Sequence, residues 1–290
     1  MTESGAPLPE RLDAENPYAP PQSAPSADSA SGLPFTVQDV FQWSWTIFSE
    51  RVSTCLSIFW TVVGIRLVAS FGLSAIQNSL AAGVRDEYAY KILWILSSFA
   101  TYVLLFWVEI GLTLAMIKIA RGELVSFEDI FSGGHFLLTL ILAWIVRTVL
   151  LAIPILVAVG IIIGGIVLME NQSGVAAFLL YLFVSGIAGV FFIIMAARLA
   201  IFYYLVIDRN AGVFESLIES WRMCRNQVAT VTLVYAVEFA VVVAGILALC
   251  VGLIFAAPLM VLIDTVMYLA ILTGATSGAT KPRFSIDEEA

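Results

Sequence analysis

A chain of 290 residues with 60% hydrophobic and only 12% charged residues lies far outside the range of soluble proteins, in which about a quarter of residues are charged. Its formal net charge of −8 is a poor guide to partners, because much of it sits in the tails, but nothing in the sequence resembles a basic nucleic-acid-binding surface. Several continuous apolar runs of about 20 residues or more predict an all-α, polytopic membrane helix bundle and exclude a β-barrel, whose strands alternate.

Residues 1–34 form the first segment, and their composition predicts a disordered cytoplasmic tail. Seven of the ten prolines fall here, among Ser, Ala and acidic residues, and such a segment cannot bury a core. It has no basic stretch followed by an apolar one, so we expect no signal peptide. The membrane domain is expected at residues 35–274, and the polar residues 275–290 should form a second cytoplasmic tail.

Three short amphipathic segments are expected to lie at the membrane surface. The first begins at a capping box of Thr36 and Asp39, and the second at an equivalent pair, Ser126 and Asp129. The third, residues 213–225, has apolar residues at helical spacing and charged residues on the other side. The apolar face of the first should consist of Val37, Val40, Phe41, Trp45 and Phe48. The expected interfacial contact residues of the protein are Trp45, Trp221, Arg222 and Arg225.

Six membrane spans are predicted between and after these segments. The third run, residues 136–169, is longer than one straight crossing requires. Pro154 should kink this helix, and a helix broken at Pro154 is the alternative. The first, second and fourth spans are expected at residues 52–77, 92–117 and 175–207, and the last hairpin at residues 228–257 and 258–274.

The distribution of Lys and Arg outside the spans predicts the orientation. Only Arg85 and Lys91 occur in the first, third and fifth loops. The other loops and the two ends carry nine basic residues: Arg11, Arg51, Lys118, Arg121, Arg209, Arg222, Arg225, Lys281 and Arg283. The positive-inside rule therefore places both termini in the cytoplasm. We expect a multi-pass protein of the cytoplasmic (inner) membrane.

An internal repeat is a further hypothesis. An offset of 176 residues brings Ser44 and Trp45 onto Ser220 and Trp221. The order of the parts supports a three-fold repeat, because an amphipathic segment is followed by a helical hairpin three times. A chance alignment of apolar sequence is the alternative.

One charged residue is expected within each of the six spans, and together they would form an intramembrane charged layer. A lone charge in mid-bilayer costs at least about 2.5 kcal/mol, so we expect the six to face the interior and pair with one another. Such pairs could fix the packing of the helices, or they could line a polar cavity that binds or passes a solute or proton. The six residues are Arg66, Glu109, Arg147, Arg198, Glu238 and Asp264.

Catalytic and metal-binding motifs do not occur in the sequence. It has no HExxH, P-loop, GxSxG or dinucleotide fingerprint. Its only histidine, His135, is expected at the membrane interface. The three cysteines, Cys55, Cys224 and Cys250, are scattered and should be free thiols. We therefore expect no enzyme, no metal and no cofactor.

The chain resembles the YciC-like (UPF0259) and DUF975-type six-span bacterial membrane proteins. It is also similar to the membrane domain of some glycerophosphodiester phosphodiesterases. The resemblance rests on the stretches 116–123 and 126–131, and on Arg198, Asp208, Gly212, Ser220, Trp221, Arg225 and Asn226. It implies an integral inner-membrane protein and supplies no catalytic residues. Because no catalytic domain follows Gly274, we expect no phosphodiesterase activity.

Two functions follow as expectations. The first is a non-enzymatic membrane protein that scaffolds or modulates membrane components through its cytoplasmic interfacial helices. Its partners would be membrane lipids and other membrane proteins, and not nucleic acid. The alternative is a small-solute or ion transporter that uses the charged layer.

Overall fold

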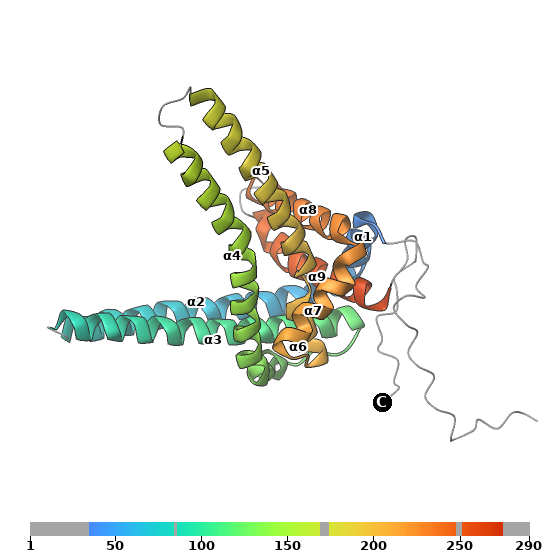
Figure 1. Cartoon of the computed structure of the whole chain (residues 1–290). Helices are drawn as coiled ribbons and strands as arrows, with labels where there is room; N and C mark the ends of the chain where they lie inside the picture. Colours follow the sequence, from blue (N-terminus) through green and yellow to red (C-terminus); the bar gives the residue numbers. More distant parts are fainter. Residues whose placement is uncertain (1–34, 84–85, 169–173, 248–250, 275–290) are drawn as a thin grey trace, which may run out of the picture. The chain divides into compact units, whose positions relative to one another are not determined.

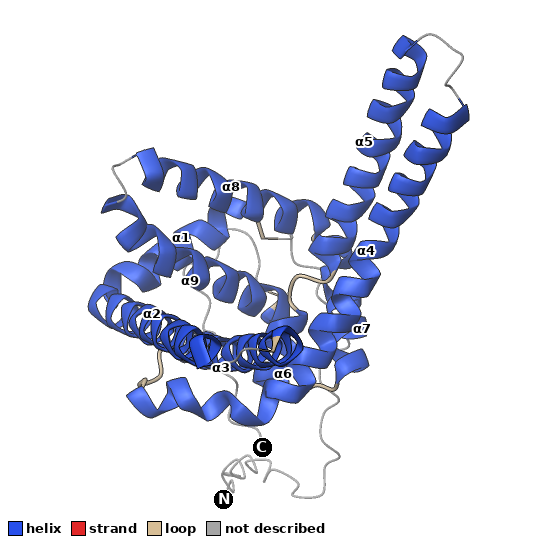
Figure 2. Ribbon diagram, turned by 90° about the vertical axis from the view of Figure 1, so that its left-hand side faces the viewer, coloured by secondary structure: helices blue, strands red, loops and turns tan. Residues whose placement is uncertain are grey.

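The structure, a computed structural model, describes residues 35–83, 86–168, 174–247 and 251–274. These residues form helices and their connections, with no strand among them (Figure 2). Six of the described helical segments are long and apolar enough to cross a membrane, which confirms the all-α, multi-pass fold class. The expected tails, residues 1–34 and 275–290, lie outside the described residues.

The helices follow the chain as shown in Figure 1. They are α1 (Val37–Glu50), α2 (Val52–Gly83), α3 (Glu87–Arg121), η1 (Phe127–Phe136), α4 (Leu137–Leu168), α5 (Gly174–Arg198), α6 (Phe202–Arg209), α7 (Val213–Met223), η2 (Cys224–Asn226), α8 (Val228–Leu247) and α9 (Val251–Thr273). An amphipathic element precedes a hairpin three times, at α1, η1 and α7. This is the order that the repeat hypothesis requires, although the repeat itself stays a prediction.

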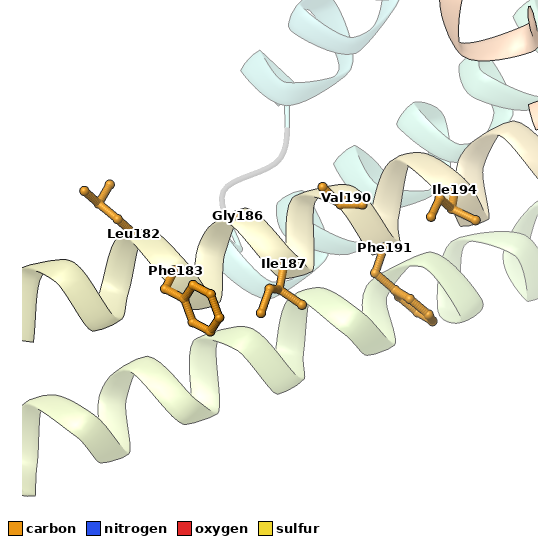
Figure 3. A pocket seen from close by; sticks show the side chains of 7 residues that line it. All are labelled: Leu182, Phe183, Gly186, Ile187, Val190, Phe191 and Ile194. Atoms are coloured by element: carbon orange, nitrogen blue, oxygen red, sulfur yellow. The ribbon is translucent and has the colours of Figure 1, made fainter. Parts of the chain in front are cut away.

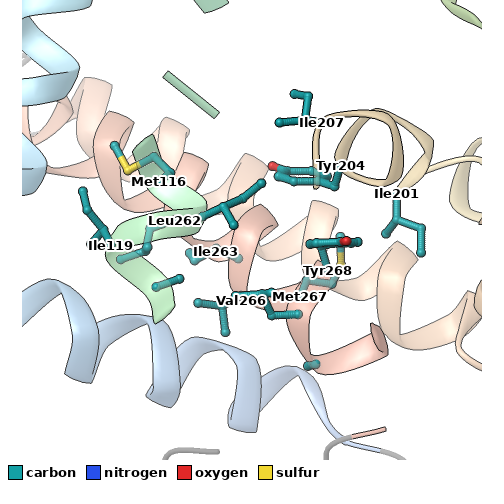
Figure 4. Close-up of a cluster of buried hydrophobic side chains, with 14 of the residues drawn as sticks. Met116, Ile119, Ile201, Tyr204, Ile207, Leu262, Ile263, Val266, Met267 and Tyr268 are labelled. Atoms are coloured by element: carbon teal, nitrogen blue, oxygen red, sulfur yellow. The ribbon is translucent and has the colours of Figure 1, made fainter. Parts of the chain in front are cut away.

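Helices α3 and α9 are the most buried of the membrane spans. Helices α1, α2, α3 and α8 all contact α9. The core between α3, α6 and α9 is apolar and includes Met116, Leu262 and Met267 (Figure 4). Within it the rings of Tyr204 and Tyr268 stack, with centroids 5.1 Å apart. Since lipid tails are as apolar as these side chains, close packing of this kind supplies much of the attraction between the helices.

Helix α1 begins at the predicted capping box. The backbone N–H of Thr36 donates to a carboxylate oxygen of Asp39 at 2.7 Å, and the N–H of Asp39 donates to the Thr36 hydroxyl at 3.3 Å. Of the residues predicted on or near one face, Val40 and Phe48 are buried, whereas Phe41 and Trp45 are exposed. The buried face of α1 consists of Val40, Trp43, Ser44, Ile47 and Phe48. Helix α1 packs against α9.

The second amphipathic segment folds as the 3-10 helix η1 and packs closely against α3. Its capping box, Ser126 with Asp129, forms as predicted. A side chain at Gly111 of α3 would collide with the backbone of Ile130. In the same way, a side chain at Gly133 of η1 would collide with Ile110. Glycine at both positions therefore allows the two backbones to approach each other.

The third run is one continuous helix, α4, with Pro154 inside it. The alternative of a helix broken at Pro154 is therefore wrong. Proline in a helix interior removes one backbone hydrogen bond and clashes with the preceding turn, which a long helix in a bundle tolerates when its neighbours hold it.

The fourth run, predicted as one span over residues 175–207, is divided into α5 and α6. The helix stops after Arg198 and resumes at Phe202. The sequence between them, Leu199–Ala200–Ile201, contains no glycine or proline, so no local signal marks the break. At the break, the Ser220 hydroxyl on α7 donates a 2.9 Å hydrogen bond to the carbonyl oxygen of Arg198.

The last hairpin also differs from the prediction, which placed its turn between residues 257 and 258. Helix α9 already begins at Val251, and Pro258 lies inside it. Because proline has no N–H, it leaves the carbonyl four residues earlier, that of Ile254, without its helical donor. The indole N–H of Trp60, on α2, donates to this carbonyl at 3.2 Å. The bond supplies the missing donor and links α2 to α9.

Candidate functional site: charged residues of the membrane spans

Arg66 and Glu109 form an ion pair between α2 and α3. The guanidinium Nη1 lies 3.2 Å from Glu109 Oε2. Tyr203 of α6 lies beside the pair, and its ring packs edge-to-face on Phe106. Farther along the same helices, the Gln77 amide donates to the Ser97 hydroxyl at 2.7 Å. Helices α2 and α3 are therefore joined by polar contacts at two levels.

Arg198, at the end of α5, lies against α7. Its guanidinium carbon is 4.5 Å from the centroid of a Trp221 ring. A cation over the face of tryptophan is attracted by the ring quadrupole, and the attraction grows where water is excluded. Together with the bond from Ser220 to the Arg198 carbonyl, this contact fixes α7 to the break between α5 and α6.

Arg147 of α4 has a similar environment. Its guanidinium carbon lies 5.4 Å from the centroid of the Phe202 ring, at the start of α6. Tyr235 of α8 is a further neighbour. The Nε atoms of Arg147 and Arg198 are both buried without a hydrogen-bond partner.

Glu238 of α8 and Asp264 of α9 lie together. Their side chains are in hydrogen-bonding contact with each other. Glu238 is only 8% exposed. Glu238 Oε1 and Asp264 Oδ1 are buried without a partner, and the phenol rings of Tyr204 and Tyr235 lie nearby.

The expected pairing of arginines with carboxylates is therefore right for Arg66 and Glu109 and wrong for the other four residues. Within the described part of the chain, no ion pair joins Arg147 or Arg198 to a carboxylate. The guanidinium groups of Arg147 and Arg198 lie against aromatic rings, and Glu238 and Asp264 contact each other. The sequence predicts that a charged residue in a span needs a partner. It does not show whether an arginine will meet a carboxylate or an aromatic ring on another helix.

A polar junction, which the sequence analysis missed, joins the ends of α3, α6 and α9. Arg121 Nη2 and the Tyr268 hydroxyl both donate to Asp208 Oδ2, each at 2.6 Å. The side chains of Arg121 and Asp208 are only 8% and 7% exposed. Arg121 and Asp208 stood in predicted loops, and nothing in the sequence indicated that they would be buried together.

The junction extends to the neighbouring elements. Lys118 Nζ lies 2.6 Å from Asp129 Oδ1, which ties α3 to η1. Arg51 donates to the carbonyl oxygens of Gly122 and Glu123 at 2.7 and 2.9 Å, where α3 ends. Several residues that carry the family resemblance thus serve as structural ties.

The four predicted interfacial contact residues differ in their exposure. Arg222 and Arg225 are exposed, and Trp45 is 52% exposed on α1. Trp221 is half-buried, because its ring contacts Arg198. The exposed apolar residues of α7 are instead Phe214 and Ile218, which the sequence analysis did not single out as contacts.

Local sequence explains how α7 is presented. Asn210 ends α6 in the left-handed conformation, with φ of 53°, which asparagine tolerates better than most residues. The carboxylate of Glu215 then accepts the N–H of Gly212 at 3.2 Å and caps the start of α7. Two helices therefore meet at a short, defined corner.

An apolar groove of about 490 Å³ lies along α5 (Figure 3). Seven residues line it: Leu182, Phe183, Gly186, Ile187, Val190, Phe191 and Ile194. None of their side chains carries a polar group, so this groove suits hydrocarbon and offers nothing to bind a polar solute.

The described residues contain no group of three or more His, Cys, Asp or Glu side chains that could hold a metal ion. Cys55 and Cys224 are free and buried, as predicted, whereas Cys250 lies outside the described residues. Burial raises the pKa of the Cys224 thiol to about 11, which keeps it protonated and unreactive at neutral pH.

No family model, curated protein or solved structure matches the chain.

Proposed function

We propose that this chain is a non-enzymatic, multi-pass protein of the cytoplasmic (inner) membrane that scaffolds or modulates membrane components. Both termini would lie in the cytoplasm, as the Lys and Arg distribution predicts. The contact surface would be the exposed face of α7, together with Trp45 of α1. The resemblance to the YciC-like and DUF975-type proteins implies the same class of protein and stays a prediction.

This proposal rests on the difference between the two faces of α7, one of which is buried and the other exposed. One face is held firmly, since Ser216, Leu217 and Ser220 are buried and Trp221 contacts Arg198. The other face leaves Phe214 and Ile218 exposed, at 68% and 61%. A helix held in this way presents its free side chains in a fixed geometry, which favours recognition over loose insertion.

Charge supports the same surface. Arg222 and Arg225, at and just beyond the end of α7, are exposed and lie close to the exposed apolar residues. Basic residues beside an apolar helix face are typical of surfaces that contact anionic lipid headgroups at the membrane boundary. Membrane lipids and other membrane proteins are therefore the proposed partners.

Site-specific photo-crosslinking in native membranes tests this proposal. A photoreactive residue at Phe214 should give discrete crosslinked products with lipids or membrane proteins. One at Tyr88, which is more exposed but stands at the start of α3, should give few. Charge reversals R222E and R225E should each reduce the Phe214 products, with K91E as the matched control. Equal products at Phe214 and Tyr88, or products that R222E and R225E leave unchanged, would contradict the proposal.

A proton- or solute-transporting function is the second candidate, and the contact of Glu238 with Asp264 favours it. Two carboxyl groups in contact away from water hold a proton between them. Their two unpartnered oxygen atoms leave room for a further hydrogen bond. Ionisable residues within membrane spans commonly mark proton relays or substrate paths.

A further inference from the structure

The ion pair of Arg66 and Glu109 is much more exposed than the ion pair of Arg121 and Asp208. Its side chains are 40% and 47% exposed, although both stand within membrane spans. By contrast, Arg121 and Asp208 are 8% and 7% exposed. Of an apolar stretch of 18 residues within the α2 span, only 6% are buried. Helix α2 is therefore the least buried of the six spans.

Exposure of this kind is costly in a membrane. A charged pair that faces hydrocarbon loses the solvation that water would give it, and the pair lies too far from the ends of α2 and α3 for a headgroup to cover it easily. Charged residues in spans accordingly face other protein or water. A protein partner that carries charge of its own would meet this requirement.

We propose that a second copy of this chain covers this face, through a two-fold axis along the membrane normal. Two-fold symmetry brings the same patch of both copies together. A patch that carries one positive and one negative group is self-complementary under this operation, because Arg66 of each copy can face Glu109 of the other. The result is a closed, neutral network of four charges.

Another exposed residue of the hairpin suits the same interface. Tyr102 is 73% exposed and stands two helical turns before Glu109, on the same side of α3. On α2, Val68 and Phe71 are exposed but stand two and five residues after Arg66, on the other side of the helix, so they lie outside this patch. Tyr102, an aromatic residue with a hydroxyl, would flank the charged centre, as in other buried interfaces. The inference uses α2 and α3 and stands independently of the function proposed for α7.

Mixed charge-reversal variants test the proposal in reconstituted bilayers. Copies that carry a donor or an acceptor fluorophore are mixed, and energy transfer reports their association. Wild type should associate. R66E alone places like negative charges on both sides of the interface, and E109R alone places like positive charges there, so each should lose association. R66E mixed with E109R should regain it, since their patches are complementary. Reversal of a remote exposed residue, R209E, should leave association unchanged.

The mixture separates an interface from a fold defect. If the single variants fold and remain apart when mixed, the proposal is overturned. It is equally overturned if wild type is monomeric at every protein-to-lipid ratio, or if it associates regardless of R66E and E109R. Should either single variant fail to fold, the double variant R66E/E109R keeps the pair within each chain. This variant should fold and associate with itself, and a folded monomer would contradict the proposal.

Discussion

Arg121 and Asp208 show at the residue scale what burial does to an ion pair. Removing one partner of a buried pair leaves an uncompensated charge, which costs about 3–5 kcal/mol. We therefore expect R121M to lower the free energy of unfolding by this amount, measured by denaturant titration in mixed micelles. R209M is the control, because the Arg209–Glu219 pair is 48% and 31% exposed and such surface pairs are worth about 0–1 kcal/mol. Equal losses would contradict the buried junction.

Trp60 and Pro258 should be coupled energetically. W60F removes the indole donor to the Ile254 carbonyl, so we expect a loss of about 1–3 kcal/mol. In a P258A background, the alanine N–H replaces the indole as donor. W60F should then cost much less, and a double-mutant cycle measures the difference. An equal cost of W60F in both backgrounds would show that the indole does not serve this carbonyl.

Cys224 should resist alkylation while the protein is folded. Its pKa of about 11, against an ordinary value of 9, lowers the thiolate fraction about 100-fold at neutral pH, and burial blocks access as well. In a C55A/C250A background, maleimide should label Cys224 slowly, and faster as the pH approaches 11. Labelling should be rapid after denaturation. R222C, in a C55A/C224A/C250A background, is the exposed control. Equal rates at both positions would contradict the burial of Cys224.

At the scale of elements, the contact of α3 with η1 depends on glycine. G111A should destabilise the protein by about 1–3 kcal/mol, because the new methyl group would collide with the Ile130 backbone. The matched control is G160A, where an added side chain meets nothing within 4 Å. We expect G160A to be neutral or slightly stabilising, since alanine favours a helix over glycine. Thermal midpoints in detergent measure both, and a harmless G111A would contradict the close approach.

The elements that local chemistry determines were predictable from the sequence. Capping boxes at Thr36 and Ser126 set where two segments begin, and the apolar runs set the number of spans. The break after Arg198 and the start of α9 before Pro258 were not predictable. Each lies beside a carbonyl that accepts from another helix, from Ser220 in one case and Trp60 in the other. Local sequence carries no record of such partners.

The candidate site was predictable to a similar degree. Hydropathy identifies which charges lie in the spans, because each one interrupts an apolar run. It does not identify their partners, and it gave Arg147 and Arg198 carboxylates where the structure has Phe202 and Trp221. It also did not predict the contact of Asp208 with Tyr268, because Asp208 stood at a span's end and nothing in the sequence links it to a tyrosine 60 residues later.

For the whole molecule, the charges within the spans appear as four separate arrangements. Arg66 pairs with Glu109, two arginines lie on aromatic rings, and Glu238 contacts Asp264. The first three tie helices to one another, and Arg198 in particular holds α7 in place for the proposed contact surface. Glu238 with Asp264 is the arrangement that would also serve transport. The scaffold proposal assigns this contact a structural role between α8 and α9.

Proton flux into liposomes that contain the purified protein therefore tests the central claim most directly. A pH-sensitive dye inside the vesicles records the flux for wild type, E238Q and protein-free vesicles under an imposed gradient. The scaffold account predicts that wild type and E238Q give the same flux as empty vesicles. It also predicts that E238Q is less stable than wild type, because the contact between α8 and α9 is weakened. A flux above that of empty vesicles, abolished by E238Q in a protein that still folds, would contradict the account and establish transport.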